Sequence, residues 1–177
     1  MTLSTQAEAF LAAINAGPAL HTLPVEDLRA LQLPVIAAPE AEVEDLGIPT
    51  ADGHRLPSRL YRPIGVQGPL PVLLYFFGGC WVIGAIDKYA AVCARLAIGA
   101  RCAVLCVGYR QAPEHPWPAA PDDCEAAARW VAGNPAELGR TVTSLIFCGD
   151  SAGGNLTVVI AAALRDKPAA LPVIDRK

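Results

Sequence analysis

The chain has 177 residues, of which 53% are hydrophobic and 18% charged, and its net charge is −3. This composition indicates a globular protein with an ordinary core and excludes an intrinsically disordered chain. The sequence has no block of basic residues, so charge favours neither nucleic acid nor an anionic membrane as a partner. We therefore expect a substrate that is neutral or that is recognised by local contacts.

Neither a secretory signal nor a membrane span is predicted. The first basic residue is Arg29, so the charged start of a signal peptide is lacking. Residues 63–86 carry no charge, but their prolines and glycines predict a buried strand and a glycine loop. The 6 cysteines form no C-x-x-C pair and lie mostly in apolar runs, which predicts free buried thiols, no metal site and a cytoplasmic protein.

The first part of the chain has a helical pattern. Residues 5–16 place apolar side chains on one helical face, and Gly17-Pro18 ends that helix. A second short helix is predicted at 25–32. From about residue 41 the pattern becomes one of strands, with 42–48 and 57–62 flanking a hairpin turn at Asp52-Gly53.

Strands and helices then alternate along the chain. The continuous apolar run at 71–77 predicts a strand buried on both faces, and 102–108 and 143–148 predict two further strands. Helices are expected at 88–98, with Asp87 as N-cap and Gly99 as its end, from Pro121 to Gly133, and at 152–165. This alternation predicts an α/β fold of parallel βαβ units with right-handed crossovers.

Residues 149–153, Gly-Asp-Ser-Ala-Gly, lie between the predicted strand 143–148 and the helix that follows it. Strand, sharp turn and helix is the context in which a G-x-S-x-G serine acts as a nucleophile. The two glycines leave room where strand and helix crowd together, and the helix N-terminus directs N–H groups at an oxyanion. The other interpretation is a Gly/Ser-rich turn that caps a helix.

A second informative stretch is Phe76-Phe77-Gly78-Gly79-Cys80-Trp81, at the end of the predicted strand 71–77. Adjacent glycines let the backbone approach a bound group closely. Their N–H groups, with that of Ala152, are therefore candidate oxyanion donors. The alternative is an ordinary strand-to-helix loop.

Three segments in order resemble the hormone-sensitive-lipase-like family of α/β-hydrolases, which includes bacterial acetyl esterases and arylesterases. Residues 75–84, Tyr-Phe-Phe-Gly-Gly-Cys-Trp-Val-Ile-Gly, are similar to the family's His-Gly-Gly-Gly-Trp segment. Residues 109–120, Tyr-Arg-Gln-Ala-Pro-Glu-His-Pro-Trp-Pro-Ala-Ala, are similar to its Tyr-Arg-Leu-Ala-Pro-Glu-His-Pro-Phe-Pro-Ala-Ala segment, and residues 149–155 match its nucleophile segment. The resemblance runs from about residue 40 to 165.

The resemblance implies an α/β-hydrolase fold, here partial, with N-terminal cap helices at 1–38 and an incomplete core at 39–177. It implies hydrolysis of a carboxylic ester through an acyl-serine, without cofactor or metal. The residues it assigns are Ser151 as nucleophile and Gly78, Gly79 and Ala152 as oxyanion-hole donors.

The sequence departs from the family pattern in the oxyanion segment. Phe77 stands where the family has His, and phenylalanine cannot organise the loop by hydrogen bonding. Cys80 replaces the third glycine, which strains the loop if that position needs a positive φ.

The larger departure is that no histidine follows Ser151, although in this fold the triad acid and histidine follow the serine. The histidines present are His21, His54 and His115, and the chain is expected to be nearly inactive without its general base. A non-catalytic ligand-binding protein on a hydrolase scaffold, as in plant gibberellin receptors, is the alternative, and completion by a second chain is another. If later strands are missing, the strand 143–148 lies at a sheet edge where the chain can self-associate.

Overall fold

The computed structural model describes residues 3–31 and 37–173, and the chain divides into two compact units, Met1–Leu33 and Pro34–Lys177. The first unit holds α1 (Thr5–Asn15), the short 3-10 helix η1 (Leu20–Thr22) and α2 (Val25–Ala30). The Ser4 hydroxyl caps α1 by accepting a hydrogen bond from the Ala7 N–H at 3.2 Å. Both helices predicted in this part of the chain are present, and residue 32 lies outside the described residues.

The second unit is built on a mixed sheet in the order β1-β2-β4-β3-β5. Its strands are β1 (Glu42–Pro49), β2 (Arg55–Arg62), β3 (Leu70–Phe76), β4 (Ala103–Val107) and β5 (Val142–Gly149). The hairpin β1–β2 is antiparallel and joins the rest through an antiparallel β2–β4 pair. β3 pairs in parallel with both β4 and β5, as the predicted βαβ units require.

Strand β3 lies at the centre of the core. All its residues except Pro71 are buried, and β4 is buried throughout, which confirms the interpretation of both apolar runs. Pro71 has no N–H to give to a sheet ladder, and the β3–β5 register shifts between Leu70 and Val72. The strand is therefore held between two neighbours, with its carboxyl end at the glycine segment.

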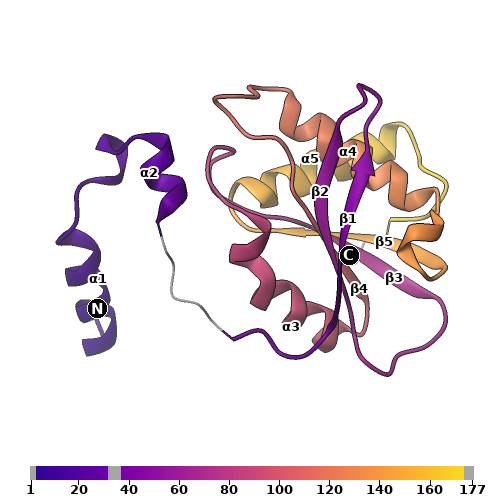
Figure 1. Cartoon of the computed structure of the whole chain (residues 1–177), viewed down its shortest axis with the longest axis horizontal. Helices are drawn as coiled ribbons and strands as arrows, with labels where there is room; N and C mark the ends of the chain where they lie inside the picture. The colour runs from indigo at the N-terminus through magenta and orange to yellow at the C-terminus, as the bar shows by residue number, and fades with distance from the viewer. Residues whose placement is uncertain (1–2, 32–36, 174–177) are drawn as a thin grey trace. The chain divides into compact units, whose positions relative to one another are not determined.

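Two layers of helix cover the sheet. Helix α3 (Ala90–Ala100) packs against β2 and β4, while α4 (Ala119–Ala132) and α5 (Ala152–Asp166) pack on each other and on β5. Figure 1 shows α3 on one side of the sheet and the α4–α5 pair on the other. The short 3-10 helices η2 (Ile86–Tyr89) and η3 (Ala136–Leu138) complete the unit.

Helix α3 differs from its prediction at both ends. Asp87 lies inside η2 and does not cap α3, because its carboxylate accepts a hydrogen bond from Arg59 Nη1 at 2.6 Å. Gly99 lies within the helix, which ends when Arg101 adopts the left-handed conformation at φ 51°. Helix α4 likewise begins at Ala119 rather than at Pro121.

Among the described strands, β5 is the outermost on its side of the sheet. It pairs along its length with β3, and on its other side a single parallel bridge joins Leu145 to Val173. The Leu145 N–H donates to the Pro172 carbonyl at 3.0 Å. The segment from Leu171 to Val173 therefore lies beside the outer edge of β5 at this point.

Candidate active site

Ser151 occupies the sharp turn between β5 and α5 in a conformation that L-residues rarely adopt, with φ 49° and ψ −117°. Such strain at a strand-to-helix junction is characteristic of a nucleophile elbow. The residue is exposed, while Ala152 and Gly153 behind it are buried. The turn therefore presents the hydroxyl at the surface, next to the N-terminus of a helix of 15 residues.

The glycines on either side of Ser151 are required by close backbone approach. A Cβ on Gly153 would lie 1.8 Å from the Phe76 carbonyl oxygen, and a Cβ on Gly149 would lie 2.5 Å from the same oxygen. Only glycine lets α5 approach the end of β3 this closely. The interpretation of these residues as spacers between strand and helix is confirmed.

Asp150 ties the elbow to the glycine segment. Its Oδ1 accepts hydrogen bonds from the Tyr75 hydroxyl and from the Gly78 N–H, both at 3.0 Å. Its Oδ2 accepts one from the Tyr89 hydroxyl at 3.0 Å. Burial, with a smaller contribution from Asp150, raises the pKa of Tyr89 to about 12, so this hydroxyl stays a donor at neutral pH.

The N–H of Gly78 is therefore not free to act as an oxyanion donor. Its N–H was predicted to be an oxyanion donor, but it is committed to the carboxylate of Asp150. In the described part of the chain, the N–H groups of Gly79, Cys80 and Ala152 make no hydrogen bond. These three N–H groups are therefore the candidate oxyanion donors.

Phe77, which replaces the family's histidine, holds its segment by stacking. Its ring is 1% exposed and stacks on Tyr109 at 4.6 Å and on Tyr89 at 5.7 Å between ring centroids. The Tyr109 hydroxyl donates to the Phe77 carbonyl at 2.6 Å. Aromatic packing and this bond fix the start of the loop without an imidazole.

The loop beyond Phe77 is strained at Cys80, where the sequence predicted strain, and also at Trp81, for which nothing was predicted. Cys80 has φ 53° and Trp81 φ 58°, both in the left-handed region. Gly79 has φ 122°, and a Cβ there would lie 1.8 Å from the Ile83 carbonyl oxygen. The replacement of a glycine by Cys80 is thus tolerated in a conformation that glycine would adopt more easily.

The loop between β4 and α4 is held by an ion pair that the sequence patterns missed. Arg110 Nη2 lies 2.6 Å from Asp123 Oδ1 and its Nε lies 3.0 Å from Oδ2, while the Arg110 N–H also donates to Oδ2 at 2.8 Å. The Asp123 side chain is 1% exposed. Asp123 lies in the helix predicted from Pro121 to Gly133, and the sequence signal for its pairing was Arg110 in the motif that resembles Tyr-Arg-Leu-Ala-Pro-Glu.

The remaining candidates are quickly placed. Within residues 3–31 and 37–173, the Ser151 hydroxyl makes no hydrogen bond to a side chain, and no cluster of His, Cys, Asp and Glu could hold a metal. All six cysteines are free, and only Cys80 is exposed. No helix in the described residues is long and apolar enough to cross a membrane.

Comparison with known proteins places this geometry in a family. A family model described as alpha/beta hydrolase fold matches residues 73–174. The carboxylesterase NlhH of Mycobacterium tuberculosis is 42% identical over 139 residues, which are 78% of this chain and 44% of that protein. The ethyl acetate hydrolase of Pseudomonas putida is 35% identical over 178 residues, covering 93% of this chain and 56% of that one.

A hyperthermophilic esterase from the archaeon Pyrobaculum calidifontis superposes with a TM-score of 0.84 at 34% identity, covering 97% of this chain and 57% of that one. The chain thus spans about half the length of the relatives it matches. The strained serine between two close-packed glycines, the sheet order and these matches show that the chain belongs to the α/β-hydrolase-fold family, in its hormone-sensitive-lipase-like branch.

Proposed function

We propose that this chain carries the nucleophile and oxyanion hole of a serine carboxylesterase acting on small, neutral esters. The observation that supports this most is Ser151, exposed at φ 49° on the β5–α5 junction. Its Oγ attacks the acyl carbon, the alcohol leaves, and water releases the acid from the acyl-serine. The relatives' names, carboxylesterase and ethyl acetate hydrolase, support the same reaction class.

The oxyanion that forms in this attack is stabilised by the N–H groups of Gly79, Cys80 and Ala152. Gly79 was assigned from the sequence together with Ala152, and Cys80 takes the place of Gly78, whose N–H is bonded to Asp150. Losing one such donor typically costs about 10²–10³-fold in rate. Asp150 orients the loop by holding Gly78 and does not touch the substrate.

Turnover by the 177-residue chain is expected to be slow. A serine hydroxyl is a weak nucleophile without a general base, and within residues 3–31 and 37–173 no histidine side chain hydrogen-bonds Ser151. In a serine protease, loss of the histidine alone costs roughly a millionfold, and an acceleration on the order of 10³–10⁴ over water remains. We propose that the chain retains this residual activity.

The test is hydrolysis of p-nitrophenyl acetate together with labelling by a fluorophosphonate probe. Ser151→Ala should abolish both the residual turnover and the label, whereas Thr157→Ala on the same helix should keep them. The Thr157 hydroxyl donates only to the Gly153 carbonyl, at 2.9 Å, so its removal leaves the site intact. Equal rates for the wild type and Ser151→Ala would remove Ser151 from the mechanism.

We further propose that residues 1–38 act as a cap over the acyl pocket.

We also propose that the outer edge of β5 pairs with a second copy of the chain. Beside that edge lies a groove of about 680 Å³ with Phe147, Val158, Ala161 and Leu171 among its walls. An apolar sheet edge invites pairing with another chain. Sedimentation velocity should show a concentration-dependent dimer, and Val158→Glu, which puts a charge on the exposed wall of this groove, should lower its population. A monomer at all concentrations contradicts the proposal.

A further inference from the structure

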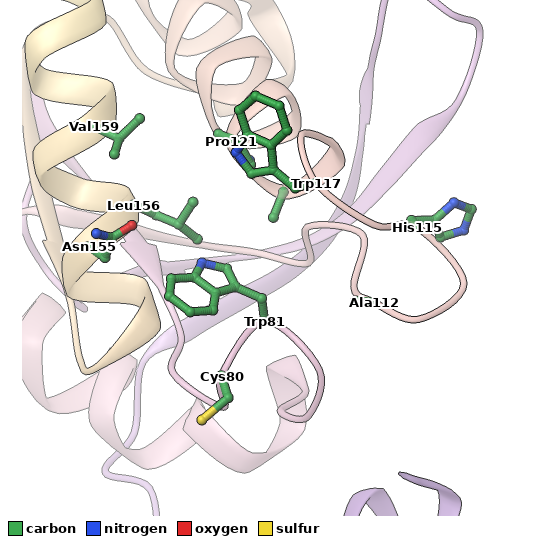
Figure 2. Close-up of a pocket in the computed structure, with 10 residues that line it drawn as sticks. Cys80, Trp81, Ala112, His115, Trp117, Pro121, Asn155, Leu156 and Val159 are labelled. Atoms are coloured by element: carbon green, nitrogen blue, oxygen red, sulfur yellow. The ribbon is translucent and has the colours of Figure 1, made fainter.

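Two loops lie side by side at the edge of the sheet where β3 and β4 end. The β3 loop spans residues 77–85 and the β4 loop spans residues 108–118. Both line a cavity of about 340 Å³, at which Figure 2 shows Cys80 and Trp81 of the β3 loop and Ala112 of the β4 loop. Because the β3 loop carries the candidate oxyanion donors, the contacts that fix its path bear on the chemistry at Ser151.

Three hydrogen bonds join the two loops, and in each the donor belongs to the β4 loop. The bond from the Tyr109 hydroxyl, described above, holds the start of the β3 loop. The Ala112 N–H donates to the Trp81 carbonyl at 2.9 Å, near the middle of the loop. The Gln111 Nε2 donates to the Gly84 carbonyl at 3.3 Å, near its end. The β4 loop therefore fixes the β3 loop at three points.

Gln111 is the donor that departs from the segment this chain resembles. That segment, Tyr-Arg-Leu-Ala-Pro-Glu, has leucine at this position, and leucine has no N–H to donate. The Gln111 Oε1 is buried and has no hydrogen-bond partner among the described residues. A buried acceptor without a partner is unfavourable, and a leucine of similar size would avoid it. The glutamine thus adds little net stability over leucine, which points to a role in the site.

Gly84 packs behind the peptide unit that carries one of the candidate oxyanion donors. It has φ 117°, and a Cβ built on it would lie 2.6 Å from the Gly78 carbonyl oxygen. That oxygen and the Gly79 N–H belong to the same planar peptide unit. The direction of the Gly79 N–H therefore depends on where the Gly84 backbone lies.

From these contacts we propose that Gln111 is a positioning residue for the oxyanion hole. Its amide holds the Gly84 carbonyl, and Gly84 in turn aligns the Gly79 N–H with the oxyanion formed at Ser151. This rests on the proposed esterase function and adds a residue that supports it. Gln111 is not among the residues that line the cavity, so it acts through the loop and does not touch the substrate. It gives this loop a side-chain hydrogen bond in a chain whose Phe77 can give none.

The test measures how a fluorophosphonate probe reacts with Ser151, as the rate constant at saturation, kinact, and the probe's dissociation constant, KI. Gln111→Leu should lower kinact about tenfold, because a misdirected donor loses part of the 10²–10³-fold effect of a donor removed. KI should change by about twofold or less, since the oxyanion forms only during the reaction. Gln111→Met, which keeps the side-chain length without a donor, should behave alike and carries the test if Gln111→Leu is unstable.

Gln67→Leu is the matched control. Gln67 is exposed on the loop that precedes β3, so the same atoms are changed at the opposite end of the strand. This variant should keep the wild-type kinact and KI. Urea unfolding separates positioning from support of the fold: Gln111→Leu removes one hydrogen bond and one unpartnered acceptor together, so its unfolding midpoint should stay close to that of the wild type.

Hydrogen exchange of the amides in residues 78–85, followed by mass spectrometry, tests the contact without relying on Ser151. Exchange should be about tenfold faster in Gln111→Leu and unchanged in Gln67→Leu. A wild-type kinact in Gln111→Leu, or one that falls only in step with the urea midpoint, would overturn the proposal even if Ser151→Ala abolishes labelling. If Ser151→Ala still took up the label, the esterase function would fail and exchange alone would decide: faster exchange in Gln111→Leu supports the hold of Gln111 on the loop, and unchanged exchange overturns it.

Discussion

At the scale of single residues, the site depends on backbone atoms that approach closely. The Phe76 carbonyl touches the two glycines that flank Ser151, and the Ile83 carbonyl touches Gly79. These contacts are made with main chain, which cannot swing aside as a side chain can. The strained Ser151 is held in place because helix and strand on either side of it are locked together.

Gly153→Ala should therefore be severely destabilising, because its new Cβ would lie 1.8 Å from the Phe76 oxygen. Overpacking of this kind costs about 1–3 kcal/mol or more, and urea unfolding should show a loss at the upper end of that range. The matched control is Gly99→Ala on α3, where a Cβ meets nothing within 4 Å. That change should raise the free energy of unfolding by about 0.5–1 kcal/mol; similar effects of both changes would show that the close approach is relaxed.

At the scale of elements, the Arg110–Asp123 pair connects the loop after β4 to the second turn of α4. Arg110 also pairs with Asp52 in the hairpin turn, at 2.8 Å. One guanidinium thus joins the β1–β2 hairpin, the loop that carries Trp117, and the helix behind it. These contacts hold the path of the loop after β4.

Asp123→Ala should cost about 3–5 kcal/mol of unfolding free energy, because it leaves a largely buried guanidinium without its main partner. Asp52→Ala should cost much less, since that carboxylate lies in solvent and its bond to Arg110 is the minor one. Urea unfolding of both variants gives the comparison. Equal losses would show that Asp123 is no more important than its exposed counterpart.

The elements that could be predicted from the sequence are those set by local patterns. The continuous apolar runs located β3, β4 and β5, and the Gly-x-Ser-x-Gly spacing located the elbow. Two of the errors come from contact between distant parts of the chain. Asp87 does not cap α3 because it pairs with Arg59 of β2, and Gly78 is not free because Asp150, 72 residues later, binds its N–H. Local patterns carry no information on either contact.

At the scale of the whole molecule, each of the chain's tyrosines is buried or half-buried, and burial raises the pKa of each phenol. Burial raises the pKa of Tyr61 to about 12 and that of Tyr89 to about 12, and it raises those of Tyr75 and Tyr109 further. The unfolded value is about 10. The folded state therefore favours the protonated phenols.

Stability should fall in alkali for this reason. Because the folded pKa values lie above the unfolded one, the stabilisation is fully present below pH about 10 and is lost as the pH rises through about 12. Ultraviolet titration should show no tyrosinate near pH 10 while circular dichroism reports a folded chain. The tyrosine ionisation step near pH 10 should return when the chain is unfolded in concentrated guanidinium chloride. Tyr89→Phe should make the loss of unfolding free energy in alkali shallower. A tyrosine that ionises near pH 10 in the folded chain would contradict this.

The phenyl ring of Phe77 affects how the oxyanion segment responds to pH near neutrality. An imidazole in that place would gain or lose a proton in this range and would alter the loop's hydrogen bonding with it. A hydrocarbon ring between Tyr89 and Tyr109 has no proton to exchange. The anchoring of the oxyanion segment by this stack is thus indifferent to mild acidification.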